Sequence, residues 1–216
     1  MKKNMYSLIL SEDVVREIDR LAYEQGTNRS NFIDEILAEY CRMVTPEMRI
    51  RNIFDRVLEL CEGTRFLPSK EPSSATMTLR TSLEYKYHPT VKYDVQLFRR
   101  RGRAFGQLKV GLRSQSVELL RVLGDFFNRF AMIEEKYSLA DPSRRGVYSF
   151  DGARFTRVLV LPEAREYDAT EIANAINSYV ALLDGMLNAY FAGHYRTELD
   201  MEKDYLRRLN AMPIHV

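Results

Sequence analysis

The start of the chain forms a unit that is too small to fold alone, and this constrains the protein more than any other feature. Residues 4–10 alternate in polarity like a short strand, and Ser11 is a helix N-cap followed by acidic residues. Gly26 ends that predicted helix, and Asn28 or Thr27 caps a second one. A unit of roughly 40 residues buries too little apolar area to be stable by itself. We therefore expect two chains to pair their strands into an antiparallel ribbon above interlocked helices.

This order of elements resembles the ribbon–helix–helix DNA-binding family, of the Arc/MetJ type, over residues 4–43. The resemblance depends on the strand, on Leu10-Ser11-Glu12 at the start of the first helix, on Gly26, and on the polar start of the second helix. It implies that the paired strands of a homodimer enter the major groove of double-stranded DNA. The implied function is sequence-specific transcriptional regulation.

The resemblance also implies which residues contact DNA. The outward side chains of the strand, which face the bases in this family, are Met5, Ser7 and Ile9. The positions that contact backbone phosphate are occupied by Lys2, Lys3, Thr27, Asn28, Arg29, Ser30 and Asn31. A helix N-terminus suits an anion because its first amide groups have no partner in the helix and its dipole is positive there.

Two properties of this module differ from those of a strong DNA interface. Met5 and Ile9 offer only apolar contact, suited to a thymine methyl, and Ser7 discriminates poorly between bases, so we expect weak selectivity. Residues 1–44 hold six Lys or Arg and eight Asp or Glu, whereas DNA affinity depends on neutralising phosphates. The alternative interpretation is a dimerisation module with a solvated surface of mixed charge.

The rest of the chain divides into three predicted parts. Residues 45–63 form a connecting helix that starts at Thr45-Pro46 and is expected to extend or brace the dimer. Residues 64–75 are rich in Pro and Ser and are interpreted as a linker. Residues 76–216 then form a second domain, which we expect to sense a ligand, bind a partner or join dimers into larger oligomers.

In the second domain the apolar period changes from 3.6 to 2 residues, which is typical of strands. Three predicted strands with short turns between them span residues 76–87, 91–97 and 107–112. Asp151-Gly152 marks a further hairpin, and long apolar-periodic helices begin near Ser114 and Asp168. The sequence therefore predicts the α+β class, with an antiparallel meander of four or five strands packed by long helices on one face.

The sequence contains no signature of catalysis or metal binding. It lacks a phosphate-binding glycine loop, a nucleophile elbow and a metal-ligand motif. The histidines are scattered along the chain at His88, His194 and His215. Cys41 and Cys61 are each expected to be small buried apolar residues. We predict no enzyme activity, cofactor or metal, and the lack of an export signal or membrane-spanning run predicts a cytoplasmic protein.

An arginine-rich turn is a candidate second anion contact. It contains Arg99, Arg100, Arg101 and Arg103. Guanidinium groups match phosphate oxygens, although a solvated turn that keeps the sheet soluble is the other interpretation.

Aromatic residues beside basic ones in the predicted strands are interpreted as core rather than as a stacking surface for single-stranded nucleic acid. These residues are Tyr85, Tyr87, Tyr93, Phe98 and Phe105. A rival function for the whole chain is an antitoxin or mobile-element accessory protein whose second domain binds a protein partner.

Overall fold

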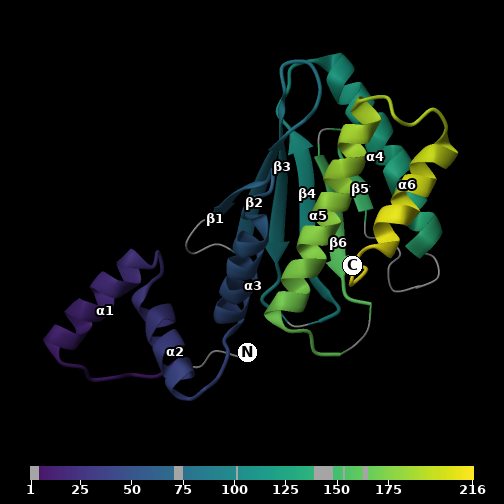
Figure 1. Ribbon diagram of the computed structural model, residues 1–216. Helices are drawn as coiled ribbons and strands as arrows, with labels where there is room; N and C mark the ends of the chain where they lie inside the picture. Colours follow the sequence, from purple (N-terminus) through teal and green to yellow (C-terminus); the bar gives the residue numbers. More distant parts are fainter. Residues whose placement is uncertain (1–4, 71–74, 101, 139–147, 153, 163–164) are drawn as a thin grey trace.

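The computed structural model consists of a six-stranded antiparallel sheet, four helices that cover one of its faces, and two further helices that stand apart (Figure 1). The described residues are 5–70, 75–100, 102–138, 148–152, 154–162 and 165–216. The helices are α1 (Glu12–Glu24), α2 (Arg29–Tyr40), α3 (Pro46–Cys61), α4 (Val117–Ser138), α5 (Ala169–Phe191) and α6 (Glu198–Asn210). The predicted α+β class is confirmed.

The sheet has the order β1-β2-β3-β4-β6-β5, and every neighbouring pair is antiparallel. The strands are β1 (Leu67–Lys70), β2 (Thr76–Ser82), β3 (Thr90–Leu97), β4 (Ala104–Leu112), β5 (Tyr148–Phe150) and β6 (Arg154–Val160). The predicted hairpin at Asp151-Gly152 joins β5 to β6, with Gly152 at a φ of 90°. The side chain of Asp151 accepts a hydrogen bond from the Arg154 N–H at 2.7 Å, which closes this turn.

Two boundaries differ from the predictions. The segment predicted as a linker, residues 64–75, contains β1, which pairs with β2 and lies at the edge of the sheet that the described residues form. An edge strand tolerates Pro68 because one side of its backbone needs no partner in the sheet. The strand predicted over residues 76–87 ends at Ser82, because Tyr87 and His88 adopt positive φ angles and form a turn before Pro89.

The helices lie on one face of the sheet because side chains along its central strands alternate between buried and more exposed positions. On β3, Tyr93 and its alternate neighbours are buried, whereas Lys92 on the opposite face is exposed. Phe127 of α4 stacks on Phe155 of β6 with ring centroids 4.7 Å apart. We call the other face, which no helix covers among the described residues, the open face.

α3 is one of the helices that cover the sheet, and its apolar side chains form part of the core. Its apolar stripe packs against α5 and β1, and Phe54 and Val57 are completely buried. The expectation that the helix over residues 45–63 extends or braces the N-terminal dimer stays a prediction. Cys61 is buried as expected, but Cys41 at the end of α2 is exposed, because α2 buries only Phe32.

The aromatic residues predicted as core differ in burial. Tyr93 and Phe105 are buried, Tyr85 and Phe98 are partly buried, and Tyr87 is exposed at the tip of its turn. No helix in the described part of the chain combines the length and the apolar composition needed to cross a membrane.

Two polar networks join the helix layer to the sheet. Asp184 on α5 is buried and accepts hydrogen bonds from the Thr81 and Tyr93 hydroxyls, both at 2.8 Å. Its other carboxylate oxygen lies 3.1 Å from the guanidinium of Arg65. Burial, together with the Asp184 charge, raises the pKa of Tyr93 well above its usual value. This network fixes the position of α5 over β2 and β3.

The second network is centred on Glu134 of α4, which is also buried. Its carboxylate lies 2.9 Å from Nε of Arg157 on β6 and accepts a hydrogen bond from the Tyr179 hydroxyl of α5 at 2.9 Å. It accepts another from the Tyr205 hydroxyl of α6 at 3.3 Å. Arg157 also donates to the carbonyl of Val216. One carboxylate therefore connects three helices with a strand.

Candidate nucleic-acid interface

α1 and α2 form the helical hairpin expected from the sequence (Figure 1). After α1, Gly26 adopts a φ of 61°, and the N–H groups of Gly26 and Thr27 bond to the carbonyls of Tyr23 and Ala22. This is a Schellman ending, which glycine favours because it has no Cβ. Of the two predicted caps, Asn28 is the one observed, and its side-chain oxygen accepts from the Asn31 N–H at 3.0 Å.

Arg29, expected to contact phosphate, holds the two helices together in this structure. Its Nε and one terminal nitrogen lie 2.6 and 2.5 Å from the two carboxylate oxygens of Asp19 on α1. Hydrogen bonding to Arg29 lowers the pKa of Asp19. Both side chains are about half exposed. The positive charge of Arg29 is therefore largely neutralised within the chain, which sequence reasoning did not foresee.

The segment that precedes α1 has neither helix nor strand structure in a single chain over residues 5–10. Met5, Ser7 and Ile9, predicted to face bases, are all exposed, and Lys2 and Lys3 lie outside the described residues. Leu8 and Leu10 are 61% and 40% exposed, against 97% for Met5. Because ribbon pairing needs a second chain, the predicted strand stays a prediction.

Apolar side chains are concentrated on the surface of this N-terminal part. Twelve of the seventeen large apolar side chains exposed in the described residues lie between residues 5 and 44. Within α1 and α2 only Ala22 and Phe32 are buried. A single copy of the module thus has no core of its own, since the face carrying Ile36 and Leu37 remains uncovered.

The module is joined to the rest of the molecule at the start of α3. Glu35 on α2 and Arg51 on α3 form an ion pair at 2.6 Å, and Glu35 is mostly buried there. Thr45 is buried and caps α3 by accepting from the Met48 N–H at 3.1 Å. These contacts tie the start of α3 to the end of the module, as the short connection between them requires.

In the arginine-rich turn between β3 and β4, Arg99 and Arg103 contact different parts of the chain. Arg99 is paired with Glu47 at the start of α3, at 3.1 Å. Arg103 donates to the carbonyls of Leu161 and Pro162 at 3.2 and 2.6 Å, which fixes the end of β6. Arg100 is exposed, and Arg101 lies outside the described residues. Arg99 and Arg103 thus have structural partners outside this turn.

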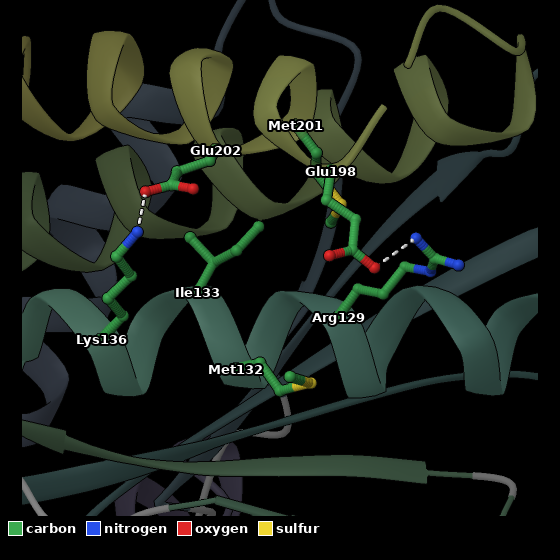
Figure 2. A pocket seen from close by; sticks show the side chains of 7 residues that line it. All are labelled: Arg129, Met132, Ile133, Lys136, Glu198, Met201 and Glu202. Atoms are coloured by element: carbon green, nitrogen blue, oxygen red, sulfur yellow. Dashed lines mark hydrogen bonds and ion pairs between the residues drawn. The ribbon is translucent and has the colours of Figure 1, made fainter. Parts of the chain in front are cut away.

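A small pocket lies between α4 and α6 (Figure 2). It has a volume of about 200 Å³ and an apolar lining that includes Ile133. Arg129 pairs with Glu198 at 3.1 Å and Lys136 pairs with Glu202 at 2.5 Å. Because each charge in the pocket is matched, it offers no net charge to an ionic ligand.

The histidines do not come together with other metal ligands. Across the ranges given above, no group of three or more His, Cys, Asp or Glu side chains could hold a metal ion. His88 lies in the turn after β2 with a φ of 45°.

Comparisons with protein-family models, with curated proteins and with solved structures give no match for this chain. Its function must therefore be inferred from its own residues. Sequence reasoning missed one set of charged residues, Arg80, Lys92 and Arg113, which lie together on the open face. The signal was present in the basic residues at outward positions of β2 and β3, but the strand register was needed to combine them.

Proposed function

We propose that the protein is a dimeric DNA-binding transcriptional regulator whose N-terminal segments pair as a ribbon in the major groove. The observation that carries this proposal is the uncovered apolar surface between residues 5 and 44. Burying it against a second copy would give the module the core that it lacks. This function requires the cytoplasmic location predicted from the sequence.

The helical hairpin supports the same proposal. The N-cap residue Asn28 and the two residues that follow it, Arg29 and Ser30, are all exposed, so the start of α2 is open to solvent. The first amide groups of α2 have no partner within the helix, and together with the helix dipole they suit a backbone phosphate. In a paired ribbon, Met5, Ser7 and Ile9 would face the base edges, and the regions around Asn28 in the two copies would flank them.

A matched pair of variants tests this arrangement. Leu8 and Ile9 point to opposite sides of an extended strand, so Leu8 would face the helices and Ile9 the DNA. Leu8→Asn should shift the sedimenting species from dimer to monomer. Ile9→Asn should stay dimeric and change which genomic fragments the protein captures at physiological salt. We expect the parent protein to enrich fragments whose sites have two-fold symmetry.

Two outcomes would reject the proposal. A parent protein that sediments as a monomer with an ordered N-terminal segment would remove the ribbon. A dimer that enriches no DNA would leave the dimerisation module without a role in DNA binding, and a stoichiometric protein that co-purifies through the second domain would then favour the antitoxin or accessory function.

A further inference from the structure

The open face of the sheet carries a basic groove of about 600 Å³ over β1, β2 and β3. Its cationic residues are Arg65, Arg80, Lys92 and Arg113, and the hydroxyls of Ser82 and Thr90 lie among them. The groove is separate from the N-terminal module and from the core networks, apart from Arg65, which also reaches Asp184.

The strand register places like charges next to each other in this groove. Arg80 on β2 is directly opposite Lys92 on β3, and Lys92 is opposite Gly111 on β4. Directly opposite residues have Cβ atoms about 4.5–5.5 Å apart, and like charges in such pairs destabilise a sheet. Because Gly111 has no side chain, β4 places no side chain next to Lys92 on the side opposite Arg80.

The like charges of the groove have no direct counter-charge within the described part of the chain. No carboxylate lines the groove, and Arg80, Lys92 and Arg113 form no ion pair with any described residue. Arg65 alone is paired, with Glu84 at 3.3 Å and with Asp184. The groove therefore holds an excess of positive charge that an anion would neutralise.

A neighbouring row on the same face shows that the excess is local. There, Asp94 on β3 is directly opposite Lys109 on β4 and also Thr78 on β2. The Thr78 hydroxyl donates to Asp94 at 2.6 Å. In this row an acid is opposite a base, as cross-strand pairing favours, whereas the charged residues of the groove row, Arg80 and Lys92, are both bases.

The lining indicates the chemistry of the ligand. Three cations without an ion pair, with Arg65 beside them, suit a ligand with several negative charges, and two hydroxyls can donate to oxyanions. The lining contains no aromatic side chain on which a nucleic-acid base could stack. A volume of about 600 Å³ is within the range of small-molecule sites. We propose that the open-face groove binds a small ligand that carries a chain of phosphate groups.

Calorimetric titration of the full chain with inorganic tripolyphosphate, at about 0.15 M salt, tests this site. Lys92→Met should weaken binding by about tenfold or more, the loss expected for one charge-assisted contact. Lys109→Met removes the same charge from the same face, outside the groove, and should change the affinity by less than about twofold. Orthophosphate should bind more weakly than tripolyphosphate.

Thermal unfolding gives a second readout that does not depend on calorimetry. Tripolyphosphate should raise the unfolding midpoint of the parent and of Lys109→Met, but not that of Lys92→Met. Without ligand, Lys92→Met should unfold at a higher temperature than the parent, because the like-charge pair is removed.

Three results would overturn the proposal. One is the absence of tripolyphosphate binding to the parent at this salt concentration. Another is equal weakening by Lys92→Met and Lys109→Met, which would indicate attraction to net charge rather than a site. The third is a loss of affinity for a random-sequence DNA duplex in Lys92→Met without any loss for tripolyphosphate, which would make the groove a contact for the DNA backbone.

Discussion

At the scale of single residues, the pairing of Arg29 with Asp19 determines how the N-terminal module can attract DNA. Asp19→Asn should release the guanidinium of Arg29 and remove a negative charge. If DNA binds at the start of α2, affinity should rise for all sequences, and its salt dependence should steepen by about one released counterion for each copy. Filter binding or fluorescence anisotropy at several salt concentrations measures both effects.

Asp13→Asn is the matched control for this prediction. Asp13 also lies on α1 and is exposed, but its contact is a 3.6 Å pair with Arg16. The Asp13→Asn substitution removes the same charge without releasing Arg29, so it should change the salt dependence of DNA affinity less than Asp19→Asn does. Equal slopes for the two variants would mean that Arg29 does not contact phosphate.

The hydroxyl of Tyr93 gives a prediction about stability. Tyr93→Phe removes one of the two hydroxyls that donate to buried Asp184. A hydrogen bond to a buried charged group contributes roughly 1.5–3 kcal/mol, so the free energy of unfolding should fall by about that amount in urea titrations. Tyr85→Phe is the control, because the Tyr85 hydroxyl makes no hydrogen bond with any described residue. The prediction fails if the two variants lose equal stability.

Buried tyrosines also predict how stability depends on pH. Burial raises the pKa of Tyr93 and of Tyr179 well above the usual value near 10. In the unfolded chain both phenols ionise near pH 10, so their contribution is complete below that pH and is lost as pH rises above it. The urea free energy should therefore fall above about pH 10, together with the appearance of tyrosinate absorbance. A Tyr93→Phe, Tyr179→Phe double variant should show a shallower fall, and an unchanged slope would contradict the assignment.

At the scale of elements, the joint formed by Glu134 and Arg157 holds α4, α5 and α6 on β6. Glu134→Gln should lower the free energy of unfolding by about 3–5 kcal/mol, because it leaves a buried guanidinium without its counter-charge. Arg157→Met should lower the free energy of unfolding much less in the Glu134→Gln variant than in the parent. A double-mutant cycle measures this difference.

Glu198→Gln serves as the control for this joint. It breaks the exposed pair with Arg129 between α4 and α6 (Figure 2), which should contribute less than about 1 kcal/mol. Additive losses for Glu134→Gln and Arg157→Met would show that the two side chains are not coupled.

The elements with local signals could be predicted from the sequence. Apolar periods identified the helices, the caps at Asn28 and Asp168 set their starts, and Asp151-Gly152 marked a hairpin. β1 could not be predicted, because its Pro and Ser residues are acceptable only at the edge of a sheet that other segments form. The end of β2 depended on a turn at Tyr87 and His88 with positive φ angles, which are uncommon for residues other than glycine.

At the scale of the whole molecule, the candidate sites were only partly predictable. The helical hairpin followed from local residues, but the pairing of Arg29 with Asp19 bridges two helices and has no local signal. The basic groove required the register of β2, β3 and β4, which no single segment contains. Properties that depend on one element were therefore readable from the sequence, and those that depend on neighbours were not.

Arg65 lies at the rim of the groove and also forms an ion pair with Asp184 beneath the helices. One guanidinium thus contacts both the groove on the open face and a helix on the other face of the sheet. A phosphate chain that bound Arg65 would compete with Asp184 for this guanidinium. It would thereby weaken the contact between α5 and the strands. By reciprocity, a shift of α5 that strengthened its own pairing with Arg65 would lower the affinity for the anion. Binding of the proposed anion would thus couple the solvent face energetically to the helical layer through this shared side chain.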